Sequence, residues 1–380
     1  MQARKRGLFN CFSISYSKDC ELIVQFNVKF TIGNPPYQEE VAKVETENGQ
    51  KRSKSIFHFF QISADEIATS GSVMVYPGGR WIHRSGKGMK DFGLRQINDP
   101  SLSRLDFYPE SRDVFGSAAA VADGISIVVK NRNNNSDSFE YRFIQNESEK
   151  VVTINHPGET LITLNPSDTD ICTKIEEFCK KNKLSFLSDR VLSQKLFGIE
   201  SDFVEKNPSV VKVYNGQPLK LGEIKLLTND RAGKAGRAKW YITERKYITQ
   251  GIKYLSKWKV IVSSANAGGQ KRDSQIEIVD NFSAFGRARI AIGAFDTEKE
   301  AINFYNYCNS HIIRYCFLLT DESLTSFARK VPDLGVYFSG QFVDFTKDIN
   351  HQLCELIGLT DDEILYIDKR INDIDTKRNK

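Results

Sequence analysis

The sequence lacks the features that mark membrane, secreted and zinc-binding proteins. No apolar run reaches the roughly 18 residues of a membrane-spanning helix, so we expect no membrane partner. The seven cysteines are scattered and form no Cys-x-x-Cys pair, and the five histidines show no metal-ligand spacing. These absences predict reduced thiols, a cytoplasmic location and no metal site.

The composition is that of a folded chain with room for two domains. Hydrophobic residues make up 40% and aromatic residues 11% of the 380 residues, which excludes a disordered protein. The formal net charge of +5 permits a polyanionic partner without requiring one.

A polar and aromatic turn follows the first clear strand pattern. Residues 28–33 form an apolar strand that leads into Asn34-Pro35-Pro36-Tyr37. Open α/β sheets place their sites at the carboxyl ends of strands, so this turn is a candidate site.

The chemistry of the turn suits an extruded adenine. The side-chain oxygen of Asn34 and the carbonyl of Pro35 can both accept hydrogen bonds from an exocyclic amine, and the two prolines fix the backbone. Tyr37 offers a flat face on which the base can stack. The alternative is a proline-rich ligand turn for a WW-type domain, but such ligands belong in disordered tracts.

Helix and strand patterns alternate after the turn and predict a mostly parallel α/β sheet. We expect helices over residues 55–68 and 87–98, strands over 72–76, 102–108 and 124–130, a loop at 113–116, and paired strands at 139–144 and 150–154.

From about residue 185 the pattern becomes β-rich and basic. Lysine and arginine alternate with tyrosine and tryptophan between residues 220 and 272, as a DNA-reading surface requires, although a solvated β domain is an alternative. A long helix is expected over residues 297–319, and a last helix capped by Thr360 is expected to reach about residue 372. The candidate DNA contacts are Arg231, Lys234, Arg237, Lys239, Lys271 and Arg272.

The Asn34–Tyr37 motif, placed after a strand, resembles the catalytic motif of the DNA N6-adenine (amino) methyltransferases. The order of the following elements is similar to the second half of the catalytic domain in such enzymes from restriction-modification systems, and the basic part resembles their target recognition domain. The resemblance covers about residues 28–375, and only the four-residue motif is specific.

The resemblance implies a fold, a site and two ligands. The fold is α/β, with a partial Rossmann-like methyltransferase sheet followed by an α+β, β-rich target recognition domain. Asn34, Pro35, Pro36 and Tyr37 are the implied catalytic residues, S-adenosylmethionine is the implied methyl donor, and duplex DNA is the implied partner.

Phe115 and Trp81 are candidates for lining the base pocket. Phe115 precedes the strand at 124–130, and Trp81 follows the strand at 72–76. For each aromatic residue, packing in the core is the alternative.

One part of the family pattern is absent. Such enzymes bind S-adenosylmethionine with an Asp/Asn-Pro-x-x-Gly-x-Gly loop, and neither residues 1–33 nor residues 320–380 contain one. We therefore expect a fragment or subunit that is inactive alone and that needs a second polypeptide carrying the donor site. The alternatives are a non-catalytic DNA-binding specificity chain and, more weakly, part of an RNA or protein methyltransferase.

The expected organisation has four parts. They are a leader of uncertain structure (1–27), the C-terminal part of a methyltransferase catalytic domain (28–165), a target recognition domain (166–345) and a helical tail (346–380).

Overall fold

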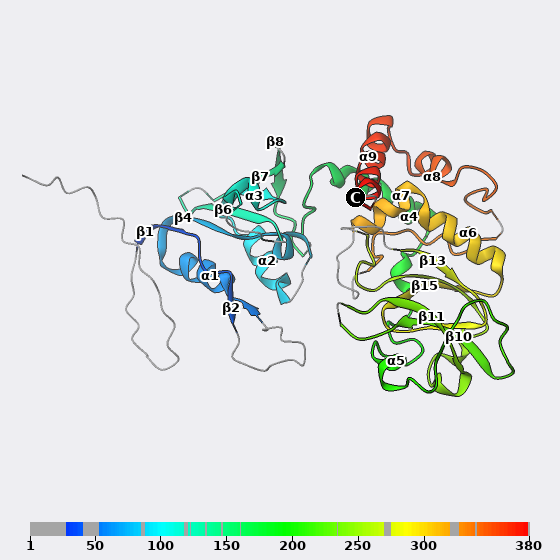
Figure 1. The fold of residues 1–380 in the computed structure, drawn as a ribbon. Coiled ribbons are helices and arrows are strands. Elements are labelled where there is room, and N and C mark those ends of the chain that lie inside the picture. The colour runs from blue at the N-terminus through cyan, green and yellow to red at the C-terminus, as the bar shows by residue number, and fades with distance from the viewer. Residues whose placement is uncertain are drawn as a thin grey trace, which may run out of the picture.

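The chain forms a sheet unit and a larger mixed unit that lie side by side (Figure 1). The expected leader, as well as Lys234, Lys271 and Arg272, lies outside the residues that the structure describes. This computed structural model describes residues 28–40, 53–84, 88–117, 121, 123–133, 135–145, 147–159, 161–233, 235–269, 275–319, 327–338 and 340–378.

The sheet unit contains a sheet with the strand order β1-β4-β6-β5-β7-β8. Within it, β1–β4 and β5–β7 are parallel pairs, whereas β6 runs antiparallel to both of its neighbours and β8 antiparallel to β7. The sheet is therefore mixed, and the prediction of a mostly parallel sheet was wrong. The strands are β1 (Val28–Gly33), β4 (Ala68–Pro77), β5 (Leu102–Tyr108), β6 (Ile125–Asn131), β7 (Ser138–Gln145) and β8 (Ser148–Asn155).

Helices α1 (Phe57–Ile67) and α2 (Lys90–Ile97) pack on this sheet. Phe57 of α1 stacks on Tyr76 of β4 with ring centroids 5.0 Å apart, and Phe92 of α2 joins the same core. Strand β4 begins directly after α1, so Gly71 is a strand residue and not the helix stop that its position suggests. A Cβ on Gly71 would lie 2.2 Å from the Lys130 carbonyl oxygen, so the close approach of β6 requires glycine there.

A buried polar network ties the two helices to the sheet. The ammonium of Lys130, on β6, lies 2.9 Å from the Asp65 carboxylate and 2.6 Å from that of Asp99. Gln61 donates to Asp65 at 2.8 Å and accepts from the Tyr76 hydroxyl at 3.0 Å. Burial raises the pKa of Asp99, but the ion pair with Lys130 outweighs it and lowers the pKa overall.

Three short elements adjoin the main sheet. Strands β2 (Gln38–Glu40) and β3 (Ser53–Ser55) form an antiparallel pair. Residues 112–115 form a single helical turn, α3 (Arg112–Phe115), where a loop was expected; its turn is closed by the Phe115 N–H donating to the Ser111 carbonyl at 2.9 Å.

The second unit contains two small sheets, β14-β10-β11-β9 and β13-β12-β15. The β-rich prediction for this region is confirmed. Their strands are β9 (Lys212–Val213), β10 (Glu223–Asn229), β11 (Ala238–Glu244), β12 (Trp258–Ser263), β13 (Glu277–Val279), β14 (Ser283–Phe285) and β15 (Arg289–Phe295). The helices of this unit are α4 (Ser167–Asn182), α5 (Phe203–Lys206), α6 (Glu298–Asn309), α7 (His311–Leu318), α8 (Ile349–Ile357) and α9 (Asp361–Arg378).

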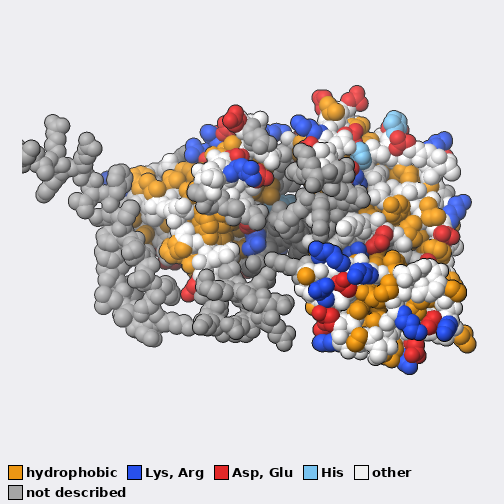
Figure 2. All heavy atoms as spheres, in the orientation of Figure 1, with side chains coloured by type: hydrophobic (Ala, Val, Ile, Leu, Met, Phe, Trp, Pro, Cys, Tyr) orange, Lys and Arg blue, Asp and Glu red, His pale blue; other side chains and the backbone are white. Residues whose placement is uncertain are grey.

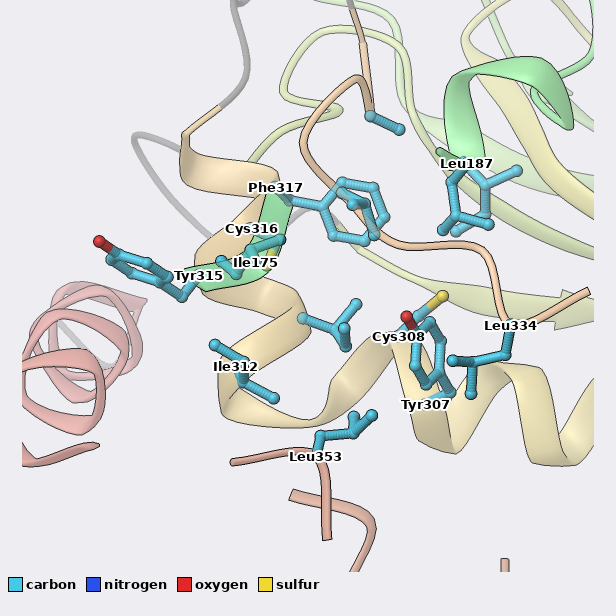
Figure 3. Packing of buried hydrophobic residues seen from close by; sticks show 14 of the residues in the cluster. Ile175, Leu187, Tyr307, Cys308, Ile312, Tyr315, Cys316, Phe317, Leu334 and Leu353 are labelled. Atoms are coloured by element: carbon cyan, nitrogen blue, oxygen red, sulfur yellow. The ribbon is translucent and has the colours of Figure 1, made fainter. Parts of the chain in front are cut away.

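The larger hydrophobic core lies among the helices of this unit (Figure 3). Tyr307 of α6, Ile312 of α7 and Leu353 of α8 point into a shared interior with Leu187 and Leu334. Residues of α8 and α9 therefore pack in one core with α4, α6 and α7. The described cysteines, Cys172, Cys179, Cys308, Cys316 and Cys354, are buried free thiols.

The helix expected over residues 297–319 is two helices. Ser310 has extended backbone angles (φ −63°, ψ 146°), and its hydroxyl donates to the Tyr307 carbonyl at 2.7 Å. Serine competes for backbone hydrogen bonds in this way, and this ends α6 and begins α7. By contrast, Thr360 forms the expected cap of α9: its hydroxyl accepts from the Glu363 N–H, and its own N–H donates to the Glu363 carboxylate. No described helix has both the length and the apolar character needed to cross a membrane.

A fully buried lysine lies between the two small sheets. The Lys259 ammonium, on β12, donates to the Ser283 carbonyl oxygen at 2.7 Å and lies 3.3 Å from that of Tyr254. Burial lowers the pKa of Lys259 to about 7.

Lys259 is expected to make stability depend on pH. Between pH 7 and about 10 the unfolded chain binds more protons at this residue than the folded protein, so the free energy of unfolding rises with pH. Relative to Lys259→Met, the wild type should gain on the order of 2 kcal/mol between pH 7 and about 9 in urea denaturation. The buried cysteines make the free energy of unfolding fall as the pH rises. Because both proteins contain them, their effect cancels when the wild type is compared with the variant. A difference that does not change with pH would contradict the assignment.

Removing the Asp168 carboxylate is expected to destabilise the second unit. It accepts from the hydroxyl of Tyr315 at 2.7 Å and lies 2.6 Å from an Arg370 guanidinium nitrogen, which joins α4, α7 and α9. Asp168→Ala should lower the free energy of unfolding by about 2 to 3 kcal/mol, because it leaves the buried Tyr315 hydroxyl without its acceptor and the half-buried Arg370 without its anion. Glu176→Ala, which breaks the exposed Glu176–Lys330 pair on the same helix, should cost less than about 1 kcal/mol. If both variants lose the same free energy of unfolding, Asp168 does not hold α4, α7 and α9 together.

Candidate functional site

The Asn34–Tyr37 turn leaves the sheet directly after β1. Because β1 and β4 are parallel, with Gly33 opposite Met74, the turn emerges at the carboxyl edge beside the last residues of β4. Gly33 itself lies close to β4, since a Cβ there would lie 3.3 Å from the Met74 sulfur. The motif therefore lies at the sheet edge where α/β sheets place ligands.

Within the turn, the two polar side chains are joined. The Tyr37 hydroxyl donates to the Asn34 side-chain oxygen at 2.8 Å. Asn34 and Pro36 are exposed, whereas Pro35 is buried and Tyr37 is half-buried against the core of the sheet unit. Burial raises the pKa of Tyr37, so its hydroxyl remains a donor at neutral pH.

Two neighbouring elements contact the backbone of the turn or of the residues that follow it. The Tyr37 carbonyl accepts from the Ile56 N–H at 3.1 Å, immediately before α1 begins. Directly after the motif, β2 pairs with β3, with Gln38 opposite Ser55. The turn is therefore held by α1 and by this pair.

Strand β1 lies at the edge of its sheet, with β4 as its described neighbour. Phe30 and Ile32 are 64% and 67% exposed, and their i, i+2 spacing places them on one face of the strand. Figure 2 shows hydrophobic side chains at the surface at this end of the sheet unit. The strand that carries the motif thus offers an unpaired edge and an apolar face.

The base-pocket candidates occupy different surroundings. Trp81 is fully buried: its indole N–H donates to the Pro77 carbonyl at 3.0 Å, and its ring contacts Tyr76 and Phe92. Trp81 is therefore a core residue here and presents no face to a ligand. Phe115 is half-buried on α3, and the described residues show no ring contact between it and Tyr37.

A cleft of about 780 Å³ opens at the same carboxyl edge, between the sheet and α9. On the sheet side it is lined by residues including Gly79, Phe107 and Asp123, and on the other side by residues including Lys369 and Arg370. The Asp123 carboxylate accepts from the Arg80 N–H at 3.2 Å, which fixes the loop after β4.

Sequence reasoning missed this cleft and the junction beside it. Asp168 lies in the first turn of α4, after the cap residue Pro166, and its carboxylate binds Tyr315, Tyr366 and Arg370. These partners lie 147 to 202 residues away along the chain, so no local pattern could indicate them.

The described DNA-contact candidates lie together on one hairpin. Arg231, Arg237 and Lys239 occupy the connection between β10 and β11 and the start of β11, and Arg231 and Lys239 have side chains 59% and 53% exposed. Figure 2 shows Lys and Arg side chains gathered where the second unit faces the sheet unit.

Comparison with known proteins gives one family model that matches part of the chain. Residues 14–115 match the family described as Eco57I restriction-modification methylase. The match includes the Asn34–Tyr37 turn and runs to α3. No protein of curated function matches.

Solved structures of restriction-modification enzymes are also similar. The type IIL enzyme MmeI in complex with DNA matches with 9% identity and a TM-score of 0.38, over 86% of this chain and 48% of its own. The type IIG endonuclease BpuSI matches with 10% identity and a TM-score of 0.34, over 88% and 49%. The type I methyltransferase subunit from Streptococcus thermophilus matches with 14% identity and a TM-score of 0.22, over 34% and 28%. The chain spans less than half the length of each, and scores this low carry no argument about function.

The described residues do not fit a methyl-donor site. No described strand pairs with the side of β1 away from β4, and the described residues place there neither a glycine-rich loop nor an acidic side chain for a ribose. Nothing in the described part of the chain therefore holds S-adenosylmethionine beside Asn34.

The open edge of β1 is expected to drive association. Replacing both Phe30 and Ile32 by lysine should reduce concentration-dependent self-association in sedimentation velocity, with a change in stability of less than about 0.5 kcal/mol. Phe282→Lys is the matched control, because Phe282 is also 64% exposed but lies outside β1. If the wild type, the double variant and Phe282→Lys sediment identically, the edge of β1 does not mediate self-association.

Proposed function

We propose that this chain is the base-binding and DNA-recognition part of a DNA adenine-N6 methyltransferase of a restriction-modification system. The observation that carries the proposal is the Asn34–Tyr37 turn at the carboxyl end of β1, inside the stretch that matches the restriction-modification methylase family. The reaction is transfer of a methyl group from S-adenosylmethionine to N6 of an adenine extruded from duplex DNA.

The turn would orient the adenine amine. The Asn34 side-chain oxygen and the Pro35 carbonyl would each accept one N6 hydrogen, which turns the nitrogen lone pair away from both acceptors. Asn34 already accepts from the Tyr37 hydroxyl, and its oxygen has a second lone pair for the amine. The Tyr37 ring would stack on the base, as aromatic side chains do for flipped nucleotides.

The second unit would recognise the duplex. Its basic β10–β11 hairpin would bind phosphates, and exposed Arg231 and Arg237 are suited to base edges or backbone.

The methyl donor would come with a second polypeptide. We propose that this partner pairs with the open edge of β1 and covers Phe30 and Ile32, which would bring its donor site next to Asn34. The chain by itself would then bind DNA without turnover.

Radiolabelled methyl transfer from S-adenosylmethionine to unmethylated bacterial DNA tests this proposal. The purified chain alone should bind duplex DNA and transfer no label. Co-expression with a polypeptide that carries a donor-binding loop should yield labelled N6-methyladenine, and Asn34→Ala should reduce that yield by about a hundredfold or more.

Two other results would change the conclusion. Transfer by the chain alone, abolished by Asn34→Ala, would show that it holds its own donor site and needs no partner. DNA binding without transfer in any complex would favour a non-catalytic specificity chain.

A further inference from the structure

A tight loop connects β10 to β11. The strands end at the pair Asn229–Ala238, and the loop between them passes through Gly236, where a Cβ would lie 2.1 Å from the Arg231 carbonyl oxygen. The Ala232 N–H donates to the Glu205 carboxylate at 2.8 Å, which anchors the loop to α5.

Asp230 lies at the centre of the basic residues of this loop. One carboxylate oxygen accepts from the Arg237 N–H at 2.9 Å, and the other lies 2.9 Å from the Lys239 ammonium. The Arg231 guanidinium approaches to 3.9 Å. The Arg237 and Lys239 hydrogen bonds lower the pKa of Asp230 to about 2, so the group is ionised at any working pH.

The arrangement places the anion beneath the cations. The side chain of Asp230 is 18% exposed, whereas those of Arg231 and Lys239 are 59% and 53% exposed. An ion pair this open to water is weak, so the Lys239 ammonium can exchange one anion for another. A DNA phosphate is such an anion.

We propose that Asp230 is an internal counter-ion that restrains the basic hairpin, and that Lys239 leaves it to bind a phosphate of duplex DNA. The inference rests on the proposed function, because it requires the hairpin to meet DNA. Asp230 then lowers affinity for arbitrary sequence, since in a non-specific complex Lys239 stays paired with Asp230 and one phosphate contact is not made. It is a positioning residue that limits non-specific binding.

Asp230→Asn separates charge from shape. The asparagine oxygen can still accept from the Arg237 N–H, so the loop keeps its closure, while Lys239 loses its anion. Affinity for a mixed-sequence duplex should rise about tenfold near 0.1 M salt, and the slope of log affinity against log salt should steepen by about 0.9, one phosphate contact. Fluorescence anisotropy between about 50 and 200 mM salt measures both quantities.

Glu244→Gln is the matched control. Glu244 pairs with Lys246 at 2.8 Å at the opposite end of β11, so this variant removes the same charge away from the loop. It should leave the salt slope unchanged. In the double variant Asp230→Asn/Lys239→Gln, affinity should return to that of Lys239→Gln alone, because the released cation is gone.

The outcomes distinguish this inference from the function on which it rests. A wild-type chain that binds no duplex DNA overturns both. If the wild type binds duplex DNA and a folded Asp230→Asn variant binds it with the same affinity and salt slope, only the counter-ion role is overturned. Thermal unfolding shows whether the variant is folded. A gain that persists in the double variant also overturns it, because Lys239 would not be the exchanging group.

Discussion

The parallel pairing of β1 with β4 is the constraint on which the candidate site depends. β4 is the described neighbour of β1, and their register places Gly33 opposite Met74 so that the Asn34–Tyr37 turn leaves at the carboxyl edge. β4 in turn is held by β6 and by the helices that pack on it. Among the described residues, the strand that carries Asn34 is therefore held from its β4 side.

Polar groups buried under the sheet make that one-sided support rigid. Lys130 of β6 binds both Asp65 of α1 and Asp99, and the chain of hydrogen bonds continues through Gln61 to Tyr76. Asp65 near the C-terminal end of α1 is thereby bound to β6, and Gln61 to β4. Because the N–H that precedes α1 donates to the Tyr37 carbonyl, the network also restrains the motif.

Charge is organised differently in the second unit. At the junction of α4, α7 and α9, the buried Asp168 carboxylate pairs with the half-buried Arg370, and this pair is part of the wall of the cleft. On the β10–β11 hairpin, Asp230 pairs with Lys239, whose side chain is exposed and can exchange one anion for another. The Asp168–Arg370 pair is suited to fixing one geometry, and the exposed Lys239 to binding a polyanion.

Local sequence determined much of this protein: the strand and turn at residues 28–37, the helix after them, the β-rich basic region and the Thr360 cap all follow from patterns within a few residues. Only the tertiary structure decided that β6 runs antiparallel, that Trp81 is buried and that Asp168 binds Arg370. Strand direction, burial and ion pairing depend on groups far apart in the chain, so patterns within a few residues do not indicate them.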